Sequence, residues 1–443
     1  MNYGQKSLAN DGIGNLFLLE IAIVLLANSF CKLFPEACYL KRSIVTSLAV
    51  IIIVASVFAT QLLLPLINTN SNQGPPMKKP GFHVGVSFGD NTTAEAKLLI
   101  DKVKNFTNLF VVQSGPVSVN ETALDEIVDY AVASGLDVIV YFGYFNPAYP
   151  WQRPWLDYAK QTWGNHFLGV YLNDEPGGQT LDVNWTGYFN QIRIRNTSIY
   201  YEHVPAIDLA LNGSLPIDNN QAAYHFLTSV ETGLGLNELK TRSITAFTAD
   251  YALYWFDYQG GYDTVFAEFG SNQSITQTIA LARGAARMQN KIWGTIITWT
   301  YDEPPYLVDG AEMYNQLLTA YMSGAKYAVI FDYPQIPGNP YGILTDAHFT
   351  ALEKFWSKIQ SLTVNNQPEA VLVLPHDYGW GMRNPNEPIW GLWAPDGTSA
   401  QIWSITQKLL TRYGTGLDIV YDDAQFPVAG KGYQQVYFWN QTV

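Results

Sequence analysis

The sequence predicts an α/β fold organised as a closed (β/α)8 barrel, and three observations support this prediction. From Gly81 onward, apolar β-rich runs alternate with amphipathic helical stretches, as parallel strands alternate with the helices that cover them. Eight such runs fit into about 280 residues, the usual length of one barrel. Two of the runs lead into the same triplet, Asp174-Glu175-Pro176 and Asp302-Glu303-Pro304.

The strands are predicted from short apolar runs, because parallel strands that are buried on both faces lack polar alternation. The runs are Phe82–Phe88, Leu109–Gln113, Leu136–Phe142, Phe167–Leu172, Ile244–Ala249, Val265–Phe269, Ile292–Thr300 and Tyr327–Phe331, with helices expected at Thr93–Lys104, Ala123–Ser134 and Asp346–Leu362. One segment, Ser198–His203, also has strand character and would shift the count after the fourth strand.

Four regions follow from this pattern. Residues 1–67 form a cytoplasmic N-terminus with one or two transmembrane segments, and the polar, Pro/Gly-rich residues 68–80 form a tether. The barrel takes residues 81–363. Residues 364–443 form a small α/β module with strands at Ala370–Leu374, Leu417–Tyr421 and Gln434–Trp439 and a helix near Ala400–Tyr413.

A membrane anchor is predicted at Ser43–Ile67, a stretch without charged residues that exceeds the roughly 20 residues needed to cross a bilayer. Lys41 and Arg42 precede it, so the main domain is expected outside the cell membrane. An apolar stretch at Ile13–Phe30 is a weaker second span because Glu20 interrupts it. A cleaved signal peptide is the alternative interpretation.

Sequons for N-linked glycosylation support the extracellular placement of the domain. They lie only after Gly81, whereas both cysteines, Cys31 and Cys38, lie before the predicted anchor, so no disulfide is expected in the outer domain. The candidate glycosylated residues are Asn91, Asn105, Asn120, Asn184, Asn196, Asn212, Asn272 and Asn440.

Composition narrows the class of partner. The net charge of −13 and pI of about 4.9 argue against a nucleic-acid partner, because few basic groups are present to neutralise phosphate. Aromatic and charged residues each make up 14% of the chain, a balance that suits a neutral ligand such as an oligo- or polysaccharide. The histidines are too scattered for metal-ligand spacing, and we expect no metal or other cofactor.

Carboxylates at the ends of strands are the candidate catalytic groups. Glycoside hydrolysis needs one carboxylic acid that is protonated and one that is ionised, placed across the scissile bond. Glu175 is the candidate acid/base, since its neighbour Asp174 and burial against Tyr171 would raise its pKa. Glu268 and Glu303 compete for the role of nucleophile. The alternative is that each Asp-Glu-Pro triplet only caps the following helix.

These motifs resemble clan A glycoside hydrolases, the (β/α)8 retaining enzymes that include cellulases and β-galactosidases, over roughly residues 82–363. In that clan the acid/base glutamate ends strand four within Asn-Glu-Pro, and Asp174-Glu175-Pro176 is similar but has aspartate in place of asparagine. The clan's nucleophile ends strand seven, in cellulase-like members within Gly-Glu-Phe-Gly. Ala267-Glu268-Phe269-Gly270 is similar, yet the simplest strand count places it on strand six and assigns strand seven to Glu303.

Other residues at strand ends are candidates for substrate binding: Asp174, Asp302, Asp250, Tyr171, Trp299 and Trp255. The resemblance implies a glycoside hydrolase. Because of the aspartate at position 174, a non-catalytic carbohydrate-binding or cell-envelope protein on a degenerate barrel is the rival. A minor alternative is a serine hydrolase that uses Ser87, since Gly85-Val-Ser-Phe-Gly89 matches the nucleophile-elbow pattern.

Overall fold

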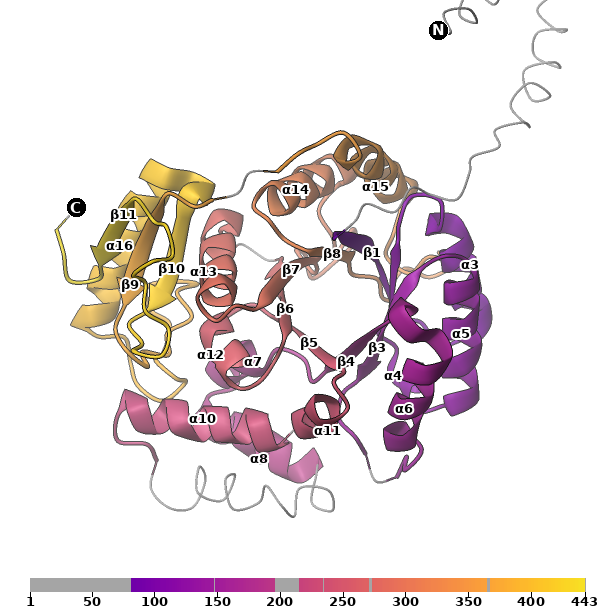
Figure 1. The fold of residues 1–443 in the computed structure, drawn as a ribbon, viewed down its shortest axis with the longest axis horizontal. Coiled ribbons are helices and arrows are strands. Elements are labelled where there is room, and N and C mark those ends of the chain that lie inside the picture. The colour runs from indigo at the N-terminus through magenta and orange to yellow at the C-terminus, as the bar shows by residue number, and fades with distance from the viewer. Residues whose placement is uncertain are drawn as a thin grey trace, which may run out of the picture. The chain divides into compact units, whose positions relative to one another are not determined.

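Eight parallel strands close into a barrel in the computed structural model, which describes residues 81–146, 148–195, 215–233, 235–270, 273–364 and 367–442 (Figure 1). The strands follow one another around the barrel in sequence order, and β8 pairs with β1. Their bounds are β1 His83–Phe88, β2 Leu109–Val112, β3 Asp137–Phe142, β4 Phe167–Leu172, β5 Thr245–Asp250, β6 Thr264–Phe269, β7 Ile292–Ile297 and β8 Tyr327–Ile330.

Helices surround the strands, and local capping chemistry begins several of them. The first, α3, starts with a capping box in which Thr92 and Glu95 satisfy each other's backbone N–H groups. The helices of the barrel are α3 Thr93–Val103, α4 Gly115–Ser118, α5 Glu121–Ala133, α6 Gln152–Trp163, α7 Pro176–Asp182, α8 Trp185–Arg195, α10 Asn219–Gly233, α11 Leu236–Thr241, α12 Tyr254–Gln259, α13 Ile275–Met288, α14 Gly310–Met322 and α15 Asp346–Ile359.

Alternation along the strands separates two apolar layers. Inward side chains such as Val111, Phe247 and Phe266 form a small core inside the barrel. Outward side chains such as Val265 and Phe269 join the larger core between the strands and the helices. Because successive residues of a strand point to opposite faces, this alternation also decides which polar residue at a strand end faces the barrel axis.

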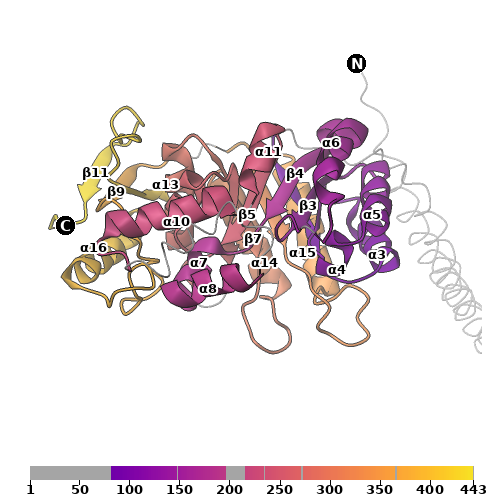
Figure 2. The same cartoon turned by 90° about the horizontal axis from the view of Figure 1, so that it is seen from below.

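The C-terminal module contains β9 (Ala370–Leu374), α16 (Gly397–Tyr413), β10 (Leu417–Tyr421) and β11 (Gln435–Phe438). Its strands form a parallel sheet in the order β10-β9-β11. The module lies beside α13 in both views (Figures 1 and 2). Arg283 of α13 joins the two parts: its Nε is 2.7 Å from Asp418 Oδ1, and its Nη2 donates to the carbonyl oxygens of Thr415 and Leu417.

Breaking this buried ion pair should destabilise the protein strongly. Arg283→Met leaves the Asp418 carboxylate buried, with the Tyr433 hydroxyl as its only side-chain donor among the described residues. Removing one member of a buried pair typically costs about 3–5 kcal/mol. Denaturant unfolding measures the change. Lys97→Met, which breaks an exposed pair with Glu126, is the control and should cost at most about 1 kcal/mol. Equal effects of the two substitutions would contradict the prediction.

The predicted strands are confirmed, and their bounds differ by at most one residue at either end, except that β7 ends at Ile297 and not at Thr300. The eight barrel strands are complete without Ser198–His203, which lies outside the described residues. The predicted cytoplasmic segment, the membrane anchor at Ser43–Ile67, the tether and both cysteines also lie outside them. Within the described ranges, no helix is both long and apolar enough to cross a bilayer.

Five of the predicted glycosylation sites fall on described residues, and all five asparagines are exposed: Asn91, Asn105, Asn120, Asn184 and Asn440. Exposure is what an acceptor site requires, but glycosylation itself stays a prediction. The other three, Asn196, Asn212 and Asn272, lie outside the described residues.

Candidate active site

Glu175 stands in a constrained turn between β4 and α7. Asn173 and Glu175 both have left-handed backbone conformations, with φ of 57° and 54°. Backbone hydrogen bonds fix the turn to its neighbours: the Asn173 N–H donates to Gly143 and the Glu175 N–H donates to Ala249 on β5. Left-handed non-glycine residues are costly and cluster at functional sites, because the surrounding structure must hold them in place.

Glu268 approaches Glu175 from β6. It shares the inward face of that strand with Phe266, two residues earlier, and remains partly exposed. The two carboxyl groups are close enough to share a hydrogen bond. Among the described residues, no ion pair involves either glutamate. The structure therefore brings together two carboxyl groups from β4 and β6.

The surroundings hold protons on this cluster. Burial raises the pKa of Glu268 well above its usual value, and the charges of Glu175, Asp174 and Asp250 raise it further. Burial also raises the pKa of Glu175, but hydrogen bonds from Glu268 and Gln179 oppose the rise. Because the surroundings of Glu268 are acidic and Glu175 has donors, the shared proton belongs on Glu268.

Asp174 lies beside the pair and accepts a hydrogen bond from the hydroxyl of Tyr171. Burial and the charge of Glu175 raise the pKa of Asp174 to about 7. Tyr171 itself is fully buried in the core inside the barrel, so its contact with the site is through Asp174. Both predicted substrate-binding residues therefore lie at the carboxyl pair.

The Asp250 carboxylate accepts hydrogen bonds from the backbone. It follows Ala249, whose side chain faces the barrel interior, so Asp250 points to the outer face of β5, where it is fully buried under α7. Its two oxygens accept four backbone N–H groups, from Gly177, Gly178, Tyr251 and Ala252. The structure thus places Asp250 as a support for the turn that carries Glu175.

A second acid supports the same region. Asp257 of α12 is fully buried next to Asp250, and neither of its carboxylate oxygens has a hydrogen-bond donor in the described part of the chain. Burial raises the pKa of Asp257 well above its usual value, and burial raises that of Asp250 to about 7. The two neighbouring carboxyl groups therefore share protons near neutral pH, because two buried like charges cannot both be ionised cheaply.

Aromatic side chains gather after β7 and β8. The centre of the Trp299 ring lies 5.2 Å from the centre of the Phe331 ring and 6.0 Å from that of the Tyr333 ring. Phe331 and Tyr333 are stacked with an interplanar angle of 8°. Tyr301 and Tyr333 are 50% and 42% exposed. These rings are available on the same end of the barrel as the carboxyl groups, because that end is where parallel strands finish.

Three other predicted site residues lie in a loop or a helix and not at a strand end. Asp302 and Glu303 are exposed in the loop after β7, because that strand ends at Ile297 and the chain leaves the barrel before reaching them. Trp255 is 3% exposed and packs on Tyr421 and Phe426 of the module. A direct contact between Trp255 and a substrate would require the module to move away.

The serine-hydrolase alternative loses its structural basis. It needs the open sheet of that fold, whereas the strands form a closed barrel. Ser87 is fully buried, and its Oγ accepts the backbone N–H of Asp332. Among the described residues, no group of three or more His, Cys, Asp or Glu side chains is arranged to hold a metal ion.

Four residues near the site had no signal strong enough to identify them from sequence. Arg383 of the C-terminal module forms an ion pair with Asp182 at the end of α7, and the Tyr251 hydroxyl donates to the same carboxylate. Tyr254 is buried among Asp250 and Glu268, and its hydroxyl has no hydrogen-bond partner among the described residues.

Comparisons with known proteins concern the fold. No family model and no curated protein matches the sequence. Among solved structures, GH5_18 from Streptomyces cattleya in complex with GlcNAc is 15% identical, with a TM-score of 0.43 over 81% of this chain and 99% of that one. A GH5_18 variant from Bifidobacterium longum subsp. longum in complex with Manb1-4GlcNAc is 10% identical, with a TM-score of 0.46 over 81% and 96%.

A 3-hexulose-6-phosphate synthase also matches, at 12% identity and a TM-score of 0.32 over 62% of this chain and 99% of that one. The shared feature is the barrel architecture, and these identities carry no information about individual residues. The chain has the closed (β/α)8 barrel fold that the sequence predicted.

Proposed function

We propose that this protein is a glycoside hydrolase. The observation that carries the proposal is the pairing of Glu175 and Glu268 at the ends of β4 and β6, within hydrogen-bond reach of each other and without a cation that fixes either in an ion pair among the described residues. Both side chains keep partial exposure. Two facing carboxyl groups with different proton affinities are the minimal equipment for cleaving a glycosidic bond.

The electrostatics favour Glu268 as the general acid and Glu175 as the ionised carboxylate. Glu268 holds the shared proton and would deliver it to the leaving oxygen, while Glu175 would stabilise or attack the anomeric carbon. This assignment reverses the roles that the clan A resemblance implies, in which the glutamate on strand four is the acid/base. It also uses strand six for the second group, where the clan uses strand seven.

Spacing favours retention of anomeric configuration. Carboxyl groups of retaining enzymes lie about 5–5.5 Å apart, and those of inverting enzymes about 6.5–9.5 Å apart to admit a water. A pair that shares a hydrogen bond is nearer the first spacing. The partly buried Trp299 and the exposed Tyr301 and Tyr333 provide flat apolar faces on which sugar rings can stack.

A screen of the full-length protein against aryl glycosides and a diverse set of poly- and oligosaccharides tests the proposal. We expect turnover of at least one class, with the product's anomeric configuration retained when followed by NMR. Binding without turnover would instead support the rival, a carbohydrate-binding protein on a degenerate barrel. Inversion would contradict the assignment of Glu175 and Glu268 as a close pair.

A further inference from the structure

The C-terminal module reaches the barrel beside α7, the helix that begins directly after Glu175. Residues 376–393, between β9 and α16, form the contact, and we call them the bridging segment. The Trp185 N–H donates to the Gly391 carbonyl oxygen at 3.3 Å. A side chain at Gly391 would collide with the Thr180 carbonyl oxygen, and one at Gly381 would lie 2.7 Å from Leu181. The bridging segment therefore packs directly on α7.

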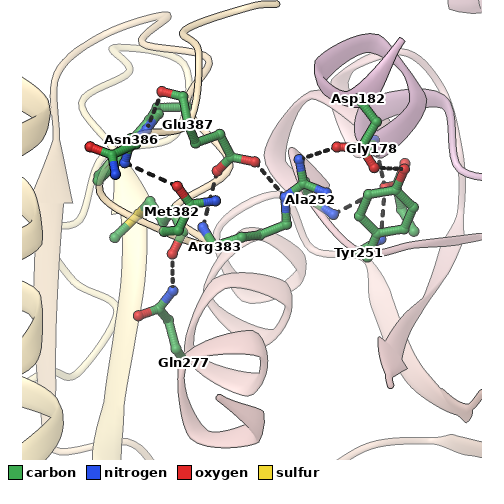
Figure 3. Close-up of polar contacts among 12 residues, drawn as sticks. Gly178, Asp182, Tyr251, Ala252, Gln277, Met382, Arg383, Asn386 and Glu387 are labelled. Carbon is green, nitrogen blue, oxygen red and sulfur yellow. Dashed lines mark hydrogen bonds and ion pairs between the residues drawn. The ribbon is translucent and has the colours of Figure 1, made fainter. Parts of the chain in front are cut away.

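Arg383 is the charged centre of this contact. Figure 3 shows it between Glu387 of the bridging segment and Asp182 and Tyr251 of the barrel. Its Nη2 lies 2.5 Å from Asp182 Oδ1, and its Nε pairs with Glu387. The guanidinium carbon lies 5.0 Å from the centre of the Tyr251 ring. Arg383 is 17% exposed and Glu387 1%, so Glu387 anchors the arginine from the module side.

The other side of the network leads to Glu175. Asp182 is the last residue of α7, and the Tyr251 hydroxyl donates to its Oδ2 at 2.8 Å. The Tyr251 ring lies against Gly178, where a side chain would collide with it. Arg383 therefore contacts α7 directly at Asp182 and indirectly at Gly178, through the ring of Tyr251. The negative charge of Asp182 and the positive charge of Arg383 both act on the Glu175 carboxyl, in opposite directions.

We propose that Arg383 is a positioning residue for Glu175, so that the C-terminal module is part of the active site and not a separable attachment. Through Asp182 and Tyr251 it fixes the short helix that starts at Glu175, and it places a guanidinium close to a cluster of acids. The expected effect on catalysis rests on the proposed function. The effect of Arg383 and Asp182 on the Glu175 carboxyl can be measured without a substrate.

Two substitutions that break the same ion pair give the test, because their electrostatic effects on Glu175 are opposite. Arg383→Gln removes a positive charge, so the pKa of Glu175 should rise by about one unit, the size expected for a nearby, partly screened charge. Asp182→Asn removes a negative charge, so the pKa of Glu175 should fall. A purely structural role would shift both variants in the same direction.

The readout is a ¹³C NMR titration of the full chain labelled at the glutamate carboxyl carbons, with Glu175 assigned by the loss of its signal in Glu175→Gln. Low ionic strength is used, because half of the Asp182 side chain is exposed and salt would screen the effect. Where a substrate is turned over, the acidic limb of the kcat/KM profile should move with the titration. If the protein turns over no glycoside, the proposed function is wrong, but the NMR titration still decides whether Arg383 acts on Glu175.

Arg287→Gln is the matched control. Arg287 also joins the barrel to the module, but it does so outside the bridging segment: it donates to the Lys431 carbonyl oxygen and lies 5.0 Å from the centre of the Tyr433 ring. It should leave the Glu175 titration unchanged. Arg383→Lys, which keeps the charge, should leave the pKa of Glu175 close to its value in the unmodified protein. An equal shift in Arg287→Gln, or none in Arg383→Gln, would overturn the proposal.

Discussion

Replacing Glu175 by glutamine should abolish turnover of every glycoside, including aryl glycosides whose leaving groups need no protonation. Glutamine preserves the shape of the side chain but cannot carry the negative charge that stabilises or attacks the anomeric carbon. A single group acting in acid–base catalysis is worth about 10²–10⁴-fold in rate, and the loss here should be at least that large on all substrates. Initial rates on a series of aryl glycosides with different leaving groups measure it.

Thermal unfolding should show that Glu175→Gln folds normally. The turn that carries the residue is held by its backbone hydrogen bond to Ala249 and by Asp250, both of which the substitution leaves in place. Replacing Glu175 also relieves repulsion within the acidic cluster, so stability should not fall. Full activity on substrates with good leaving groups would instead support Glu175 as the acid/base, the role that the clan A resemblance implies.

The fold could be predicted from sequence because buried parallel strands are short apolar runs separated by helices and turns. The elements of the C-terminal module were predictable for the same reason, since β9 and β10 are continuous apolar runs. β7 was predicted too long, because Trp299 and its neighbours continue the apolar pattern after the strand has ended. That difference matters for function: it moved Glu303 from an expected strand end into an exposed loop.

Within the site, the residues that follow from a local sequence pattern could be predicted, and contacts between residues far apart in the sequence could not. Glu175 could be identified from its place after a buried run, and strict alternation on β6 places Glu268 on the same face as Phe266. The same alternation argues that Asp250 faces away from the axis. No local rule connects Arg383 to Asp182, because these residues are 201 positions apart and meet only when the module packs on α7.

The order of proton affinities was also beyond sequence reasoning. Sequence analysis predicted a raised pKa for Glu175, and burial does raise it, but the sequence did not indicate that the pKa of Glu268 is raised as well. In the folded protein Glu175 has Gln179 and Arg383 nearby, whereas the charges that act on Glu268 come from Asp174, Glu175 and Asp250. Which glutamate carries the proton depends on this three-dimensional arrangement of charges, and no linear motif encodes it.

Glu268→Gln should separate substrates by their leaving groups. Without the proton of Glu268, the rate of hydrolysis of unactivated oligosaccharides should fall by about 10²–10⁴-fold. For aryl glycosides with good leaving groups, the rate of the step that breaks the glycosidic bond should stay near that of the unmodified protein. Glu303→Gln is the matched control: it changes a glutamate on the same end of the barrel, but an exposed one, and should leave both activities unchanged.

The pH dependence of Glu268→Gln provides an independent test of the same assignment. In the unmodified protein, activity requires Glu175 to be ionised and Glu268 to be protonated. Activity should therefore rise with pH as Glu175 loses its proton and fall at higher pH as Glu268 loses its own, whose pKa burial and neighbouring acids raise well above the usual value. Glu268→Gln removes the second group, so on an activated aryl glycoside the basic limb should vanish and the acidic limb should remain. If Glu268→Gln instead abolishes turnover of the activated aryl glycoside, Glu268 is the ionised carboxylate and the roles of the two residues are exchanged.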